Sequence, residues 1–266
     1  MSIQRRPVAV VTGASSGLGR GFAIRLAARG YDLVVVARRR ARLEELALEL
    51  RAEHGVAVLP LSCDLARPGA PARIAQQLAD SDIRVDALVN CAGFGTAGHF
   101  AAEDPDRVEQ EIAVDVTAPT LLARLLLPDL MRSPHGLLLM VSSTASHQPV
   151  PSLAVYAACK AYVTSLSAAI WQETRGSGLR VLALCPGPTD TEFFEAAGSD
   201  RFKVGRVAGV DEVLDAAFRV IDESDAPVVT VGLRNRVQAL AAKIAPLRVS
   251  LALSERATGG KVPVSA

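Results

Sequence analysis

The sequence predicts an α/β fold, a doubly wound parallel sheet with helices on both faces. Short, nearly unbroken apolar runs alternate with longer helical stretches along most of the chain, and this composition is typical of strands that are covered on both faces. Such alternation implies parallel pairing through right-handed crossovers. Half of the 266 residues are apolar, which is enough to bury a sizeable core.

The expected elements form one continuous series. The strands are the seven apolar runs Val8–Val11, Asp32–Ala37, Ala57–Leu61, Ala87–Val89, Leu137–Val141, Arg180–Leu184 and Val228–Val231. The helices between them cover Gly21–Arg29, Arg42–His54, Pro71–Asp80, Arg107–Leu130 and Tyr156–Arg175. No linker, repeat or low-complexity segment interrupts the series, so we expect one domain over residues 1–232 and a helical tail, residues 233–266, packed on it.

Composition and charge disfavour several classes of protein. The formal net charge of +1 gives no global reason to expect a nucleic-acid partner. The longest apolar runs, residues 121–127 and 137–141, are too short to span a bilayer. The first residues lead directly into a strand without the core of a signal peptide, and we therefore expect a cytoplasmic protein.

Cysteine and histidine spacing predicts no metal site. The four cysteines contain no Cys-x-x-Cys pair, and the four histidines show no ligand spacing. We expect reduced cysteines in or near the core and a diffusible cofactor only.

A glycine-rich turn follows the first strand, in the segment Thr12-Gly-Ala-Ser-Ser-Gly-Leu-Gly19. Gly13 would permit a tight turn, Gly17 would let the backbone approach a pyrophosphate, and Gly19 would let the helix pack on the strand. The helix N-terminus adds unpaired N–H groups and partial positive charge. The position of this turn predicts a dinucleotide site, which also includes Ser15, Ser16 and Leu18.

The end of the second strand indicates which dinucleotide binds. An acidic residue there would hold the ribose 2′-hydroxyl of NAD. This chain instead has Ala37 at that place, followed by Arg38, Arg39 and Arg40. A guanidinium suits a 2′-phosphate, so NADP(H) is favoured, with Arg38 as first candidate to hold the phosphate and Arg39 as second. The alternative is a solvated helix start, above all for Arg40.

The candidate catalytic groups lie around the fifth strand and the helix after it. Tyr156 and Lys160 are four residues apart, on one face of that helix. A phenol has a pKa of about 10, and a nearby ammonium lowers it by favouring the phenolate. Ser143 follows the strand and could donate to a substrate oxygen that gains negative charge, with Ser142 as the alternative.

The spacing Thr-Gly-x-x-x-Gly-x-Gly, followed in order by Ser143, Tyr156 and Lys160, resembles the short-chain dehydrogenases/reductases over roughly residues 7–232. The resemblance implies a Rossmann-like fold and hydride transfer between NADP(H) and a carbonyl or secondary-alcohol carbon. Tyr156 would be the general acid/base, Ser143 would orient and polarise the carbonyl, and Lys160 would lower the tyrosine pKa and bind the nicotinamide ribose. It also implies a homo-oligomer, a dimer or tetramer.

Further segments resemble cofactor contacts of that family. Asp64-Leu65 is similar to the pair that contacts adenine, and Asn90-Cys91-Ala92-Gly93 to the Asn-Asn-Ala-Gly turn under the cofactor. Pro186-Gly187 is similar to the segment beside the nicotinamide, where Thr191 or Thr189 would contact the carboxamide or a phosphate. Asp64 and the two threonines could instead cap turns or helices.

One departure from the family pattern concerns Asp115. Many relatives have an asparagine there, whose carbonyl helps to hold a water that links the lysine to solvent. A carboxylate can hold a water too, but it would also stabilise the Lys160 ammonium.

The substrate is less well indicated. Residues 192–209 have the position of the family's substrate lid, and Phe193 and Phe194 would suit a hydrophobic carbonyl or alcohol, unless they only dock the loop. Two other functions were weighed: a non-enzymatic NADP(H)-binding redox sensor, and a sugar-nucleotide epimerase or dehydratase. Intact Ser143, Tyr156 and Lys160 disfavour the first, and the glycine spacing disfavours the second.

The tail carries an apolar stripe at helical spacing, formed by Val237, Leu240, Ala241 and Ile244, and Pro246 should end or kink this helix. Three partners could cover the stripe: the chain's own domain, a second subunit, or, least favoured, a membrane surface attracted by four nearby basic residues. We expect the tail to fold over the substrate opening or a subunit interface.

Overall fold

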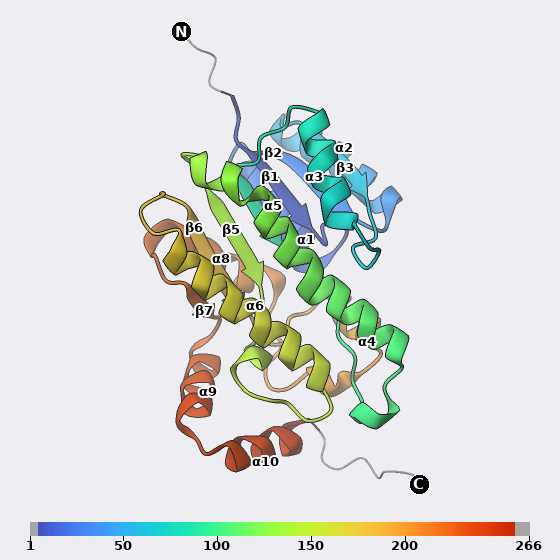
Figure 1. The fold of residues 1–266 in the computed structure, drawn as a ribbon, viewed down its shortest axis with the longest axis vertical. Coiled ribbons are helices and arrows are strands. Elements are labelled where there is room, and N and C mark those ends of the chain that lie inside the picture. Colours follow the sequence, from blue (N-terminus) through green and yellow to red (C-terminus); the bar gives the residue numbers. More distant parts are fainter. Residues whose placement is uncertain (1–4, 259–266) are drawn as a thin grey trace.

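A computed structural model describes residues 5–258 of the chain. Its centre is a seven-stranded parallel sheet in the order β3-β2-β1-β4-β5-β6-β7 (Figure 1). The strands are β1 (Val8–Thr12), β2 (Asp32–Ala37), β3 (Val58–Ser62), β4 (Ala87–Asn90), β5 (Leu137–Val141), β6 (Arg180–Cys185) and β7 (Val228–Thr230). The order reverses between β1 and β4, so the predicted doubly wound α/β fold is confirmed.

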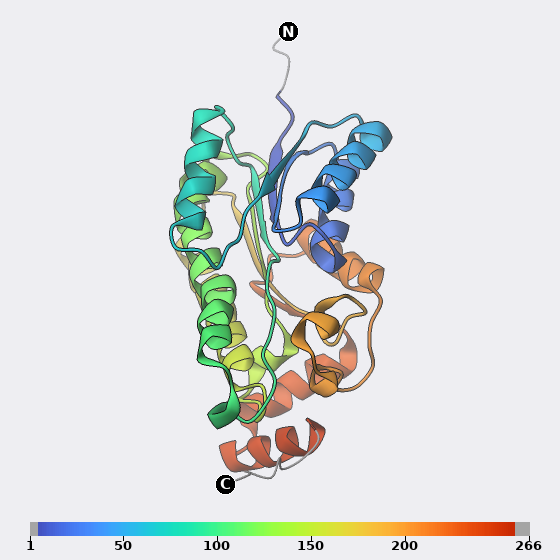
Figure 2. The same cartoon turned by 90° about the vertical axis from the view of Figure 1, so that its right-hand side faces the viewer.

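Helices cover both faces of the sheet (Figure 2). One face is covered by α1 (Gly17–Ala28), α2 (Arg40–His54) and α8 (Val210–Glu223), and the other by α3 (Ala70–Asp80), α5 (Ala118–Arg132) and α6 (Ala154–Glu173). The remaining helices are α4 (Pro105–Ile112), α7 (Phe193–Ala197), α9 (Leu233–Ile244) and α10 (Leu247–Ala257). Most boundaries lie within two residues of those expected, but α1 begins four residues earlier, inside the glycine-rich turn.

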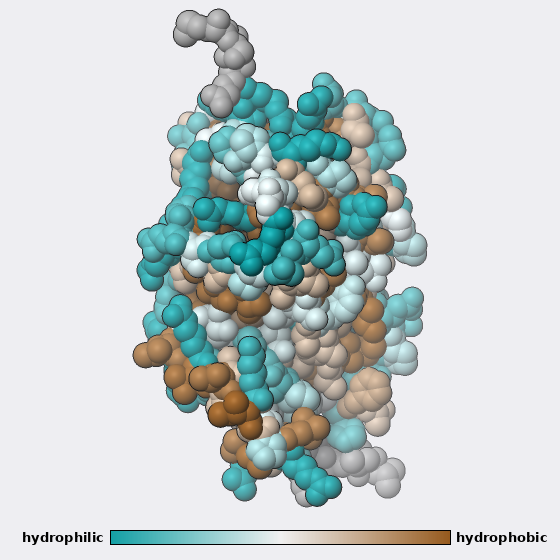
Figure 3. Space-filling model, turned by 60° about the vertical axis from the view of Figure 1, so that its left-hand side comes forward, coloured by the Kyte–Doolittle hydropathy of each residue, from teal (hydrophilic) through white to brown (hydrophobic). Residues whose placement is uncertain are grey.

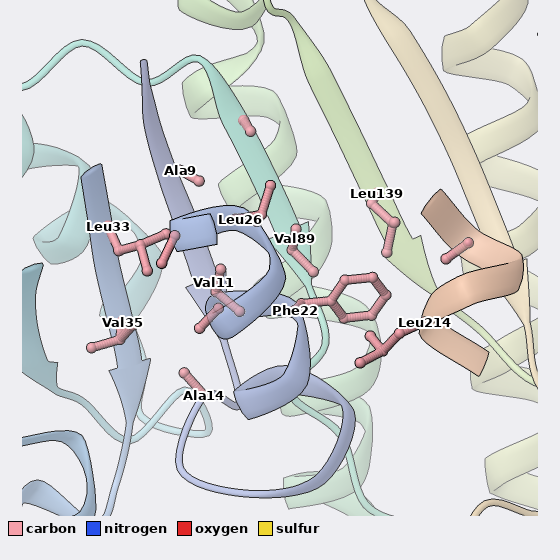
Figure 4. Close-up of a cluster of buried hydrophobic side chains, with 14 of the residues drawn as sticks. Ala9, Val11, Ala14, Phe22, Leu26, Leu33, Val35, Val89, Leu139 and Leu214 are labelled. Atoms are coloured by element: carbon pink, nitrogen blue, oxygen red, sulfur yellow. The ribbon is translucent and has the colours of Figure 1, made fainter. Parts of the chain in front are cut away.

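Apolar side chains of the strands and helices meet in two cores, one on each side of the sheet. Figure 4 shows one of them, where Phe22 of α1 lies between strand residues such as Val89 and Leu139 and Leu214 of α8. Phe22 is fully buried, and burying such a side chain stabilises a fold by about 1.5–3 kcal/mol. These cores fix the strand ends on which the site is built.

The helix predicted for Arg107–Leu130 is confirmed as a continuous helical run, but a π-helical turn that was not predicted lies inside it. Helix α4 ends at Ile112, a π-helical turn spans Ala113–Thr117, and α5 begins at Ala118. Pro119 lies in the first turn of α5, where its missing N–H is not needed. Such π-turns occur frequently at functional sites, and Asp115 lies buried within this one.

The tail forms two helices that meet at Pro246, as the sequence predicted. They lie at the end of the molecule opposite the N-terminus (Figure 1). The predicted apolar stripe points outward, because the side chains of Val237, Leu240 and Ile244 are 60 %, 64 % and 79 % exposed. Figure 3 shows apolar side chains gathered on this part of the surface. No helix within residues 5–258 has the length and apolar character needed to cross a membrane.

Candidate active site

A cavity of about 880 Å³ opens at the carboxyl end of the sheet, the edge at which doubly wound proteins bind ligands. Its walls come from the glycine-rich turn, the segments after β3, β4, β5 and β6, the lid over residues 192–204, and the inner side of α9 and α10. The sequence placed most candidate residues at these strand ends, and the cavity brings them together.

The glycine-rich turn is packed too closely for side chains. Gly13 has a φ of +70°, and a Cβ on it would lie 2.9 Å from Ala92 Cα. A Cβ on Gly19 would lie 2.3 Å from the Gly13 carbonyl oxygen. Among the described residues no side chain caps the N-terminus of α1, so its first amides remain available to a phosphate.

Thr12 joins this turn to the turn after β4. Its Oγ1 accepts hydrogen bonds from the backbone amides of Cys91 and Ala92, both at 3.0 Å. Thr12 was not among the predicted site residues. A hydroxyl side chain at the end of an apolar strand indicates a buried hydrogen bond, and the structure shows that Thr12 is buried.

Arg39, rather than Arg38, contacts the glycine-rich turn. Its guanidinium donates to the hydroxyls of Ser15, at 2.8 Å, and Ser16, at 2.7 Å. Glu192, at the start of the lid, pairs with Arg39 and with Arg42, each at 2.5 Å. Arg38 lines the same cavity. Both predicted arginines therefore line the cavity, and Arg39 contacts the glycine-rich turn directly.

The other residues predicted to contact a cofactor divide into two groups. The cavity is lined by Ser15, Ser16, Gly17, Leu18, Asp64, Leu65, Ala92, Gly93, Pro186, Gly187, Thr189 and Thr191. Asn90 is not among its lining residues: the side chain is buried and its Nδ2 donates to the carbonyl oxygen of Pro119, at 3.3 Å. Asp64 Oδ1 also accepts from the amide of Ala66, which is the turn-capping alternative.

Tyr156, Lys160 and Ser143 border the same cavity. Burial raises the pKa of Tyr156 above its ordinary value. The Lys160 ammonium and the Ser143 hydroxyl lower it, but they offset the effect of burial only in part. Ser143 Oγ accepts from the amide of Ala145 at 3.1 Å, which leaves its proton for another acceptor. Ser142 Oγ instead donates to the Lys160 carbonyl oxygen at 2.9 Å. This bond occupies the hydroxyl of the alternative serine.

Asp115 and Lys160 form a buried ion pair, with 2.6 Å between Asp115 Oδ1 and Lys160 Nζ. Asp115 Oδ2 accepts from the amide of Phe94 at 3.1 Å. Burial alone would lower the pKa of Lys160, but the Asp115 carboxylate and Tyr156 outweigh it and raise that pKa. A Cβ on Gly93 would lie 2.5 Å from Asp115 Oδ1, so glycine makes room for the pair.

The segment over residues 192–204 places aromatic rings against Tyr156. The ring centroids of Phe193 and Phe202 lie 5.6 Å and 5.1 Å from that of Tyr156. Val150 and Leu153 complete this apolar cluster. The phenylalanines thus both dock the lid and line the cavity.

The tail forms the far wall of the cavity. Small residues of α9, among them Ala239, Ala241 and Ala242, line it together with Leu253 of α10. The inner side of α9 therefore carries small residues, while its large aliphatic side chains Val237, Leu240 and Ile244 are exposed. Among the described residues, no group of His, Cys, Asp or Glu side chains is arranged to hold a metal ion.

The fold and the cavity define a doubly wound α/β protein with a dinucleotide-type turn facing a buried Tyr–Lys pair. Residues 7–201 match the family model described as short chain dehydrogenase. The chain belongs to this family of oxidoreductases.

Individual relatives agree with this assignment. A short-chain dehydrogenase of Pseudocercospora fijiensis is 36 % identical over 186 residues, which cover 69 % of this chain and 60 % of that protein. The chain thus spans less than two thirds of that relative. A short-chain dehydrogenase from Sphingobium yanoikuyae in complex with NADPH has a TM-score of 0.80 and 35 % identity, with 98 % of each chain covered. The bulky-bulky ketone specific alcohol dehydrogenase from Comamonas testosteroni has a TM-score of 0.77 and 28 % identity, covering 99 % of this chain and 98 % of its own.

Proposed function

We propose that the protein is an NADP(H)-dependent oxidoreductase that interconverts a carbonyl and a secondary alcohol on a hydrophobic small molecule. The observation that carries this proposal is the single cavity, which begins at the glycine-rich turn and contains Ser143, Tyr156 and Lys160 on its wall. Dinucleotide binding and proton transfer can therefore take place side by side.

The residues around the cavity fit a phosphorylated dinucleotide. The amides at the start of α1 would hold the pyrophosphate, and Arg39 and Arg38 would bind a 2′-phosphate that a carboxylate would repel. Asp64 and Leu65 would contact adenine, Lys160 the nicotinamide ribose, and the segment Pro186–Thr191 the carboxamide or a phosphate. When bound, the nicotinamide donates or accepts the hydride. NADPH in the Sphingobium relative supports this choice.

Tyr156 would move the proton. In reduction its hydroxyl donates a proton to the substrate oxygen while the Ser143 hydroxyl donates a hydrogen bond to the same oxygen. In alcohol oxidation the phenolate accepts the proton. The Lys160 ammonium stabilises this phenolate, and Asp115 holds the ammonium in place at 2.6 Å.

The cavity favours a bulky apolar substrate. Phe193, Phe202 and Leu153 surround the tyrosine, and the alanines of α9 leave space opposite. The Comamonas relative, described as specific for bulky-bulky ketones, supports this class.

A panel of carbonyl substrates assayed with NADPH and NADH in parallel tests the proposal. We expect oxidation of NADPH that depends on a bulky ketone and is lost in Tyr156→Phe. NADPH binding without turnover of any carbonyl would favour the redox sensor, and faster turnover with NADH would contradict the cofactor assignment.

A further inference from the structure

Glu111 is a fully buried carboxyl group that the proposed chemistry does not use. It is the one buried residue of α4 and lies one helical turn before Asp115. Its Oε2 accepts two hydrogen bonds from Thr96, from the backbone amide at 3.0 Å and from the hydroxyl at 2.7 Å. Its Oε1 is buried, and no donor among the described residues reaches it.

This arrangement favours the protonated carboxyl. A buried carboxylate oxygen without a donor is costly, whereas a protonated oxygen carries no charge. The two donors of Thr96 occupy Oε2, so the proton belongs on Oε1. Burial raises the pKa of Glu111 to about 7, with Thr96 opposing the shift and the charges of Asp115 and Glu103 adding to it.

Glu111 is tied to the catalytic groups by the segment 93–96. Gly93 packs on the Asp115–Lys160 pair, and a Cβ on Gly95 would lie 2.9 Å from the Tyr156 ring. The same segment ends at Thr96, which Glu111 binds. Helix α4 also packs against α6, which carries Tyr156 and Lys160.

The titratable groups around Glu111 come from each neighbouring element. Asp115 lies on the π-turn, Glu103 on the loop before α4, and Tyr156, Cys159 and Lys160 on α6. A negative charge on Glu111 acts on Tyr156 and on Cys159, where it raises both pKa values. Lys160 already has one carboxylate partner in Asp115, so an ionised Glu111 gives the cluster an excess of negative charge.

We propose that Glu111 is a positioning residue that controls, through its own protonation, how readily Tyr156 forms a phenolate. When Glu111 is protonated, the Asp115–Lys160 pair has no net charge, and no further negative charge opposes the phenolate of Tyr156. When Glu111 ionises, its proton passes to solvent, and the carboxylate that remains opposes the phenolate by charge repulsion. This inference rests on the proposed role of Tyr156 as acid/base.

The test is a tyrosinate absorbance titration of the full-length protein, with and without NADP⁺. Wild type is compared with Tyr156→Phe, and Glu111→Gln is compared with the double variant Glu111→Gln/Tyr156→Phe. The difference in absorbance within each comparison comes from Tyr156 alone. We expect the pKa of Tyr156 in Glu111→Gln to be lower than in wild type by about half a unit to one unit. Superimposable Tyr156 titrations would overturn the proposal.

Thr96 supplies a second variant that keeps the carboxyl group. Its hydrogen bonds lower the pKa of Glu111, so Thr96→Val should move the inflection of the kcat–pH profile near pH 7 upward, and Thr96→Ser should restore it. An inflection that stays in place in Thr96→Val would contradict the proposal even if Glu111→Gln does not fold. The tyrosinate titration needs no turnover. If the protein reduces none of the carbonyl substrates, the proposed function is contradicted, but the titration still decides the role of Glu111.

Discussion

The carboxylate of Asp115 and the ammonium of Lys160 lie 2.6 Å apart in a buried position beside Tyr156. Removing one partner of a buried pair leaves the other charge without compensation. The same carboxylate raises the pKa of Tyr156, whereas the ammonium lowers it. The pair therefore couples the stability of the fold to the proton affinity of Tyr156, the proposed acid/base.

Asp115→Asn should both destabilise the protein and shift its activity to lower pH. The amide can still accept from the Phe94 N–H, but the lost ion pair should cost roughly 3–5 kcal/mol of unfolding free energy. Without the carboxylate the pKa of Tyr156 falls, so alcohol oxidation should reach its plateau at lower pH. Urea unfolding and a kcat–pH profile measure the two effects. An unchanged profile would remove Asp115 from any catalytic role.

Tyr156→Phe should lower kcat by about 10²–10⁴-fold while NADPH affinity stays nearly the same, because proton transfer needs the hydroxyl and cofactor binding does not. Single-turnover kinetics and a cofactor titration check both parts. Tyr162→Phe is a matched control, because it makes the same change at an exposed tyrosine of the same helix. A Tyr156→Phe variant that retains more than about a tenth of the rate would contradict the assignment.

Arg38→Asp and Arg39→Asp should each weaken NADPH more than NADH, because a charge-assisted contact to the 2′-phosphate becomes repulsion at a cost of about 2–3 kcal/mol. The contacts of Arg39 to Ser15 and Ser16 predict the larger effect for Arg39. Arg40→Asp is the control, because Arg40 pairs with Glu44. Affinities for the two cofactors that fall in parallel in both variants would exclude these arginines as phosphate ligands.

The contribution of Glu111 to the stability of the protein should fall between about pH 4.5 and pH 8. The pKa of Glu111 is raised to about 7 in the folded state, so across this interval the native protein binds a proton that the unfolded chain has released. The stabilisation is complete below the unfolded pKa and is lost as pH rises through the folded value. A shift of this size corresponds to roughly 3 kcal/mol. Glu111→Gln should flatten the dependence in urea unfolding at pH 5 and pH 8, and an equally steep slope in that variant would refute the prediction.

The two sides of the tail should respond differently to substitution. Ala242→Leu fills the cavity wall and should raise the KM of a bulky ketone about tenfold, or about 1.4 kcal/mol, without changing that of a small aldehyde. Ile244 lies on the outward face, so Ile244→Ser should leave both KM values unchanged.

Truncation after Gly232 should impair the turnover of bulky substrates further. A truncated enzyme with normal kinetics and lost liposome binding would instead assign the tail to a membrane surface.

Much of the fold could be predicted from the sequence, because buried parallel strands such as Asp32–Ala37 leave an uninterrupted apolar pattern. The π-turn at Ala113–Thr117 could not, since its residues have the same helical periodicity as their neighbours. The stripe of α9 was recognised, but a pattern on one helix does not say which side faces the protein.

For the site, motif spacing placed Ser143, Tyr156 and Lys160 on one cavity. It missed Thr12 and Glu111, whose partners are contributed by other turns of the chain. The partner of Glu111 lies on another turn, so local spacing does not identify it. Arg38 and Arg39 are neighbours in the sequence, and only the structure shows which side chain contacts the glycine-rich turn.

The strand order has a consequence for the synthesis of the protein. Strand β1 pairs on one side with β2, Val8 opposite Asp32, and on the other with β4, Ala9 opposite Ala87. A nascent chain that ends before Ala87 can complete only the first of these pairings. Its strand β1, which is apolar and fully buried in the finished fold, then presents an unpaired edge of the kind that joins other chains. Ribosomal pausing before β4 has emerged should therefore leave this edge of β1 open to pairing with other chains.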